Sequence, residues 1–136
     1  MPFQWLQSRI TEEKERRNRE AQILGRLPGA MDDLGESLGA CIAAYNGAFP
    51  GDPAVLTRDG LRMTVEAGGS RVEVMSDSQL PGFQIQRDGS TVSVQVGILP
   101  GNNLFYRDVA ADQYVSLEEL TRMILDRVLF PRLKAE

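Results

Sequence analysis

Hydrophobic and polar residues alternate with different periods along the chain, and this divides it into a helical start, a strand-rich middle and a helical end. In the first segment the apolar residues Trp5, Leu6 and Ile10 precede a charged run at 11–20, TEEKERRNRE, that contains none. A helix without a continuous apolar stripe cannot bury one face along its length. We therefore expect residues 1–26 to form a charged helix that lies on the surface or projects. Acid-first pairs at i,i+4 support it: Glu12–Arg16, Glu13–Arg17 and Glu15–Arg19.

A second helix is predicted after residue 26. Apolar side chains recur there at helical spacing, and Gly47 with Pro50 provides a stop. The stripe consists of Leu27, Met31, Leu34, Leu38, Cys41, Ile42 and Tyr45. Because Cys41 falls within this stripe, we expect it to be a buried, unreactive thiol.

In the middle of the chain the period changes to two, which is typical of strands. Asp88-Gly89 and Gly68-Gly69 are two-residue hairpin turns. The first turn pairs Ile85 with Val92, and Phe83 with Val94, on an apolar face. The second pairs Val65 with Val72, and Met63 with Val74. A fifth strand, LFYRDV, follows the turn PGNN. The reverse face of the Asp88-Gly89 hairpin is polar but uncharged: Gln84, Gln86, Thr91, Ser93 and Gln95.

The last helix begins at a capping box formed by Ser116 and Glu119. Its core stripe is Leu117, Leu120, Ile124 and Val128, and further large apolar residues continue around it: Leu125, Leu129, Phe130 and Leu133. The order of elements predicts an α+β domain at 27–136, with two N-terminal helices in all, an antiparallel sheet of four or five strands and a C-terminal helix. The helices are expected on one face of the sheet.

The amino-acid composition excludes several kinds of functional site. The 136 residues include no histidine and one cysteine, so a catalytic histidine, a disulfide and a cysteine-rich zinc site are excluded. No phosphate-binding glycine sequence is present, and we expect no metal and no cofactor. The net charge of −4 disfavours nucleic acid. No apolar run is long enough to span a bilayer and no secretory signal begins the chain, so we expect a cytoplasmic protein. The acidic residues of the N-terminal helix also disfavour its contact with a membrane.

The sequence favours a non-enzymatic domain, adaptor or chaperone-like, that binds another protein or forms a homodimer. Small size, acidity and an α+β layout make its general profile similar to that of acidic dimeric secretion chaperones. It would act through the apolar helix surface and the uncharged sheet face. The candidate contact residues are Leu129, Phe130 and Leu133, because their apolar surface exceeds what one sheet face covers, together with Trp5 and Leu6 of the first helix. Either a second chain covers them or the first helix of the same chain does so through Trp5, Leu6 and Ile10.

An alternative function is small-ligand binding or catalysis. Tyr106, Arg107 and Asp108 in the fifth strand are the candidate pocket residues, since they offer a phenol, a guanidinium and a carboxylate. A deep pocket that contains them would favour this alternative, and a flat apolar surface would favour protein binding.

Overall fold

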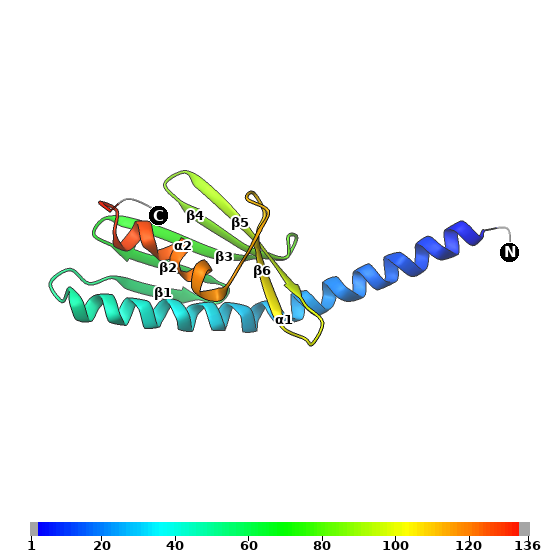
Figure 1. Ribbon diagram of the computed structural model, residues 1–136, viewed down its shortest axis with the longest axis horizontal. Coiled ribbons are helices and arrows are strands. Elements are labelled where there is room, and N and C mark those ends of the chain that lie inside the picture. The colour runs from blue at the N-terminus through cyan, green and yellow to red at the C-terminus, as the bar shows by residue number, and fades with distance from the viewer. Residues whose placement is uncertain (1–2, 134–136) are drawn as a thin grey trace.

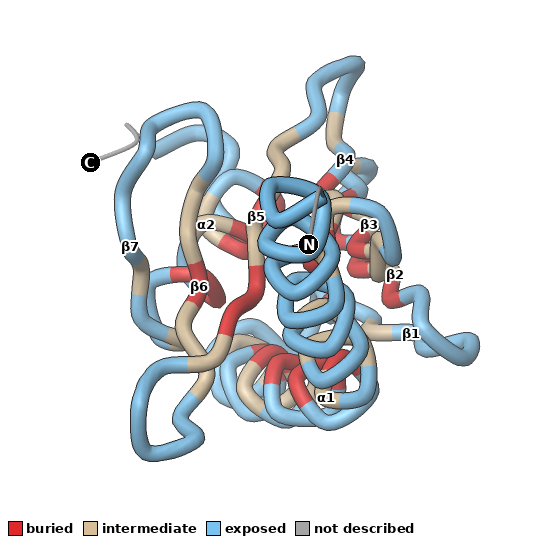
Figure 2. Tube along the Cα trace, turned by 90° about the vertical axis from the view of Figure 1, so that its right-hand side faces the viewer, coloured by how far each residue is buried: buried red, intermediate tan, exposed pale blue. Residues whose placement is uncertain are grey.

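A computed structural model describes residues 3–133 and shows an α+β domain from which one long helix projects (Figure 1). The helix α1 runs from Gln4 to Ala48 without interruption. The expectation of two N-terminal helices is therefore wrong. In Figure 2 the N-terminal turns of α1 are exposed, whereas its second half carries buried residues against the rest of the domain.

One helix forms in place of the two expected because α1 continues through Pro28. Proline lacks the N–H that would bond to the carbonyl of Leu24, and it normally kinks or ends a helix. Here Pro28 is exposed, while Leu27 and Ala30 on either side of it are buried. One buried face thus continues past the proline, and packing on the sheet outweighs the local cost. The axis bends near this point (Figure 1).

The sheet has seven antiparallel strands, and each one pairs with its neighbour in sequence. Asp88 and Gly89, both with positive φ, form the predicted tight turn, and Ile85 pairs with Val92 across it. The Gly68-Gly69 turn and its register are likewise confirmed. The strands are β1 (Val55–Asp59), β2 (Arg62–Ala67), β3 (Ser70–Asp77), β4 (Gly82–Arg87), β5 (Ser90–Ile98), β6 (Leu104–Asp108) and β7 (Gln113–Val115).

The prediction of four or five strands missed both edges of the sheet. In β1 only Leu56 is partly buried, so the strand has no apolar alternation to reveal it. The other edge strand, β7, has only three residues. Edge strands have one paired side and little core contact, and hydrophobic patterning is therefore a weak signal for them.

Both helices lie on the same face of the sheet, as expected. The second helix, α2 (Leu117–Leu129), begins with the predicted capping box and buries Leu120, Ile124 and Val128. It packs beside α1, where the hydroxyls of Ser37 and Thr121 lie 2.7 Å apart in a hydrogen bond. The strands contribute alternate residues to this core: Met63, Val65, Ala67, Val72, Val74, Phe83, Ile85, Val94, Val96 and Tyr106.

Candidate interaction surfaces

The C-terminal ends of α1 and α2 lie side by side, and a Phe-Pro dipeptide follows each helix. Phe49 follows α1 and Phe130 follows α2, and a proline comes next in both cases. A residue that precedes proline is sterically kept out of the helical region. Both phenylalanines are C-cap residues, with φ near −129° and −128°, and their N–H groups still donate to Tyr45 and Asp126. The chain therefore turns away from each helix at an aromatic side chain.

These phenylalanines meet at Tyr45. The ring of Tyr45 lies 5.0 Å from that of Phe49 and 5.7 Å from that of Phe130, the latter in an edge-to-face arrangement. Phe49 nevertheless remains 49% exposed and Phe130 37% exposed. The cluster is partly formed within the chain and keeps a large apolar surface in contact with water.

A groove of about 570 Å³ runs along this cluster between the second half of α1 and α2. We call it the α1/α2 groove. Its walls include Cys41, Tyr45, Phe49, Leu129 and Phe130, with alanines of α1 between them. A second hollow of about 580 Å³ shares the same aromatic residues and extends to Leu133. Most of the surface in the α1/α2 groove is apolar, which is typical of a site for a hydrophobic side chain or helix.

Cys41 lies in this groove and is exposed, so the prediction of a buried thiol is wrong. The buried stripe of α1 passes through Leu34, Leu38 and Ile42 instead. Cys41 follows Leu38 by three positions and falls on the side of the helix that faces α2. Spacing alone did not distinguish the sheet-facing side from that neighbouring side.

The candidate residues of the C-terminal helix have different environments. Leu129 is only 8% exposed and belongs to the domain's own core, whereas Leu133 is 68% exposed. Of these candidate residues, Phe130 and Leu133 are the ones whose side chains the domain leaves exposed. Sequence reasoning missed Phe49, and the repeated Phe-Pro at the two helix ends was the signal that could have identified it.

Trp5 and Leu6 are far from this groove, at the opposite end of α1 (Figure 1). Trp5 is 68% exposed, and Phe3, Leu6 and Ile10 near it are exposed as well. The first helix of the same chain therefore does not cover the C-terminal apolar residues through Trp5, Leu6 and Ile10. We call residues Phe3–Ile10 the helix tip.

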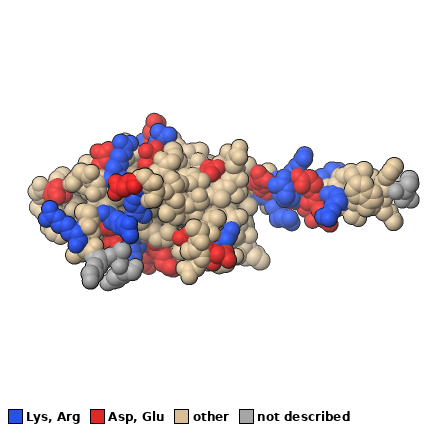
Figure 3. All heavy atoms as spheres, turned by 90° about the horizontal axis from the view of Figure 1, so that it is seen from above, with Lys and Arg blue, Asp and Glu red and all other residues tan. Residues whose placement is uncertain are grey.

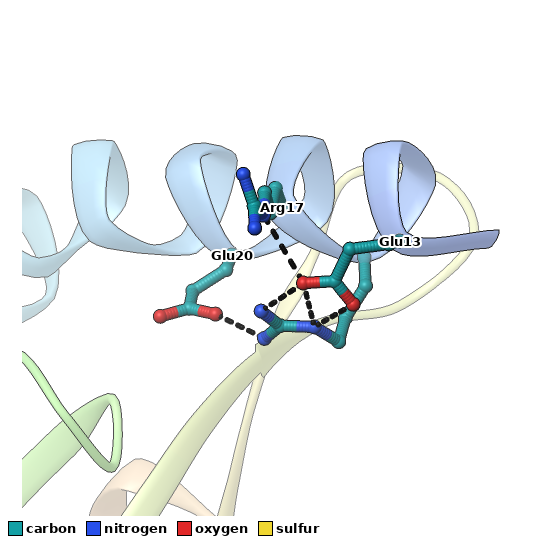
Figure 4. Close-up of polar contacts among 4 residues, drawn as sticks. Glu13, Arg17 and Glu20 are labelled. Atoms are coloured by element: carbon teal, nitrogen blue, oxygen red, sulfur yellow. Dashed lines mark hydrogen bonds and ion pairs between the residues drawn. The ribbon is translucent and has the colours of Figure 1, made fainter. Parts of the chain in front are cut away.

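A charged segment separates the helix tip from the domain (Figure 3). Glu13 accepts from both Arg16 and Arg17, and Arg16 also donates to Glu20 at 2.6 Å (Figure 4). The Glu13–Arg17 pair was predicted, but Arg16 pairs with Glu13 and Glu20 rather than with Glu12. Hydrogen bonds from the two guanidinium groups lower the pKa of Glu13 to about 2. These exposed pairs support the helical conformation where there is no core to pack on.

The residues of the alternative site do not converge. Tyr106 points into the core and stacks on Phe83, with ring centroids 6.3 Å apart, and burial raises its pKa. Arg107 lies on the opposite face, where it donates to Gln95 at 2.9 Å and to Asp112 at 2.6 Å. Asp108 accepts from the N–H of Ala111 in the following turn. Successive strand residues point to opposite faces, so these three do not line one pocket.

The uncharged outer face of the sheet forms its own hydrogen bonds. Gln84 donates to Asp77 at 2.8 Å and accepts from Ser93 at 3.1 Å. The bond from Gln84, followed by those from the backbone of Gln79 and Leu80, lowers the pKa of Asp77. Gln84, Ser93 and Gln95 of this outer face are thus engaged in hydrogen bonds, so the face offers a partner fewer free donors and acceptors than the sequence suggests.

Neither a metal site nor a membrane span is found within residues 3–133. No three metal-binding side chains of the His, Cys, Asp and Glu types gather there. Neither α1 nor α2, over the same residues, combines the length with the apolar character needed to cross a bilayer.

Comparison with known proteins adds no assignment to these surfaces. No family model matches the chain, and neither a curated protein nor a solved structure is significantly similar to it.

Proposed function

We propose that the protein is a non-enzymatic interaction domain, of an adaptor or chaperone-like kind, that forms a homodimer through the α1/α2 groove. The observation that supports this most is the aromatic cluster of Tyr45, Phe49 and Phe130, which is ordered within the chain yet partly exposed. Aromatic side chains that are held in place and open to solvent are typical anchors of protein interfaces. The pocket alternative lacks such support, because Tyr106, Arg107 and Asp108 diverge.

The size of the exposed surface supports binding energetically. A phenylalanine presents about 150–250 Å² of surface, so a ring that is 49% exposed leaves on the order of 100 Å² in water. At about 25 cal/mol per Å², covering it would contribute roughly 2 kcal/mol. Two or three such side chains are enough to form the centre of an interface.

Sedimentation equilibrium of the wild type and of groove variants tests the proposal. Phe49→Glu and Phe130→Glu each place a charge in the groove, and we expect the dimer dissociation constant to rise at least tenfold, equivalent to about 1.4 kcal/mol. Leu99→Glu is the matched control, because Leu99 is also a large apolar residue, 46% exposed, but lies in the β5–β6 loop. Circular dichroism verifies that each variant is folded.

Two outcomes would contradict the proposal. A wild type that remains monomeric at high concentration shows that the groove does not join two copies. Equal weakening by Leu99→Glu and Phe130→Glu shows that added charge, and not the groove, changes the association.

A further inference from the structure

We propose that the occupant of the α1/α2 groove is the helix tip of a second copy, so that two chains exchange their tips reciprocally. This inference rests on the proposed homodimer and names the segment that fills its contact site. It assigns a role to Phe3, Trp5, Leu6 and Ile10, which are exposed and which no contact among residues 3–133 explains.

A chain cannot place its tip in its own groove. The two features lie on one continuous helix, in which Ile10 and Cys41 are separated by 31 positions. At about 1.5 Å per residue this is a distance of roughly 46 Å along the axis. Figure 1 shows the N-terminal end of α1 and the end beside α2 at opposite extremes of the molecule. Both apolar surfaces therefore remain uncovered in a single chain.

The chemistry of the tip suits the groove. Four large apolar side chains fall within the eight residues of the tip, and the tip carries only one charged side chain, that of Arg9. The groove is lined mostly by apolar side chains, and Glu118, Arg122 and Asp126 also border it, two acids and one base that leave it with one net negative charge. Arg9 forms an exposed pair with Glu12, which costs little to exchange. A short amphipathic helix in an apolar groove is a common mode of recognition.

The available area favours a reciprocal dimer over a single contact. Phe3 is 56% exposed and Trp5 68% exposed, so the two rings leave on the order of 250 Å² in water on each tip. One tip and the groove wall it covers would bury about 500 Å², which is below the size of a stable interface. Two reciprocal contacts reach roughly 1,000 Å², the lower limit for a specific association.

A lipid surface fits the tip less well. A helix that lies in a bilayer interface needs a longer apolar face with mainly basic residues beside it. Here the apolar residues end at Ile10, and acids are interleaved with the basic residues of the following segment 11–20. These acids weaken the attraction of the segment to anionic headgroups, whereas a protein groove needs to accommodate only the first turns.

The composition of the chain provides a direct probe. Trp5 is the only tryptophan, so the intrinsic tryptophan fluorescence of the wild type reports on the helix tip alone. We expect its emission to shift to shorter wavelength as protein concentration rises through the dimerisation range. The Phe130→Glu variant should keep the emission of an exposed tryptophan over the same range.

Mixing two variants tests the reciprocal arrangement. Trp5→Glu damages the tip and leaves the groove intact, and Phe130→Glu does the reverse. Each variant alone is expected to be monomeric at concentrations where the wild type is dimeric. The equimolar mixture regains one of the two contacts, so at higher concentration we expect it to associate more tightly than either variant alone, although more weakly than the wild type. Gln7→Glu is the control, because it adds the same charge to the tip without removing an apolar side chain. Phe49→Glu replaces Phe130→Glu if the latter fails to fold.

The possible results separate this inference from the proposed function. Dimerisation of Trp5→Glu with the affinity of the wild type overturns tip exchange and leaves a groove-mediated dimer standing. A monomeric wild type overturns both. A mixture that associates no more tightly than either folded variant alone, at any concentration reached, shows that tip and groove do not contact each other. A shift of the Trp5 emission with anionic phospholipid vesicles, but not with protein concentration, identifies the tip as a membrane contact and overturns the inference.

Discussion

Replacing Pro28 by alanine tests the continuity of α1, the feature that holds the helix tip away from the domain. Pro28 lies inside the helix, and its ring is exposed to solvent. Alanine would restore the N–H that donates to the carbonyl of Leu24 and would remove the steric conflict of the ring with that carbonyl. We expect Pro28→Ala to stabilise the protein.

The magnitude follows from two opposing effects. Proline in a helix interior costs about 3 kcal/mol relative to alanine. The same ring restricts the unfolded chain, which offsets about 0.4–1 kcal/mol of that cost. Because Pro28 lies between the buried residues Leu27 and Ala30, the gain belongs to the packed part of the domain. The free energy of unfolding should therefore increase by about 2 kcal/mol.

The assay is equilibrium denaturation followed by far-ultraviolet circular dichroism at fixed protein concentration. Pro100→Ala is the control with the opposite sign. Pro100 precedes Gly101, whose φ is +90°, in a turn closed by a 3.0 Å bond from the N–H of Asn102 to Leu99. Proline suits that position, so its loss should destabilise the protein by about 0.4–1 kcal/mol.

An unchanged or lower stability of Pro28→Ala would refute the reasoning. It would mean that the chain is not helical at residue 28 in solution and that two shorter helices meet there. An equal stabilisation by both substitutions would also refute it, because the effect would then not depend on the helical position of Pro28.

Three further predictions follow from other parts of the domain. Cys41 should react rapidly with a thiol reagent in the Phe130→Glu variant and more slowly in the wild type as its concentration rises, because the α1/α2 groove becomes occupied. Tyr106 has a raised pKa, so its contribution to stability is present below about pH 10 and is lost at higher pH. The free energy of unfolding of Tyr106→Phe should therefore fall less steeply with pH in the alkaline range, measured by denaturant titrations at a series of pH values. Asp77 has a lowered pKa, so its contribution is present above about pH 4 and is lost as the pH falls through the lowered value; Asp77→Asn should reduce the loss of stability on acidification, measured in the same way.

The parts of the fold that local chemistry determines were predictable from the sequence. Asp88-Gly89 and Gly68-Gly69 adopt positive φ, which few other residue pairs tolerate, so each fixes a turn and with it the register of a hairpin. Ser116 and Glu119 likewise mark the start of α2 through a reciprocal pair of bonds. Such signals involve residues within a few positions of each other and do not depend on the rest of the chain.

Other features depend on contacts that sequence patterning does not contain. Pro28 indicates a break, but the sheet packed against both sides of it keeps the helix continuous. Cys41 has the spacing of a core residue, yet the position of α2 decides that it faces a groove. At the candidate site, Phe130 was identified from an excess of apolar residues, whereas Leu129 is covered by the domain's own core.

The sequential order of the sheet affects how the protein forms during synthesis. Every strand bonds to its neighbour in sequence, so each hairpin can close within microseconds once its second strand is available. The apolar face of α1 from Leu27 to Ile42 has no such local partner, because the sheet and α2 that cover it are made afterwards. At about 5–20 residues per second, the roughly 90 residues after α1 take on the order of 5–20 s to synthesise. During that interval the apolar face of α1 is exposed on the nascent chain and is accessible to a ribosome-associated chaperone.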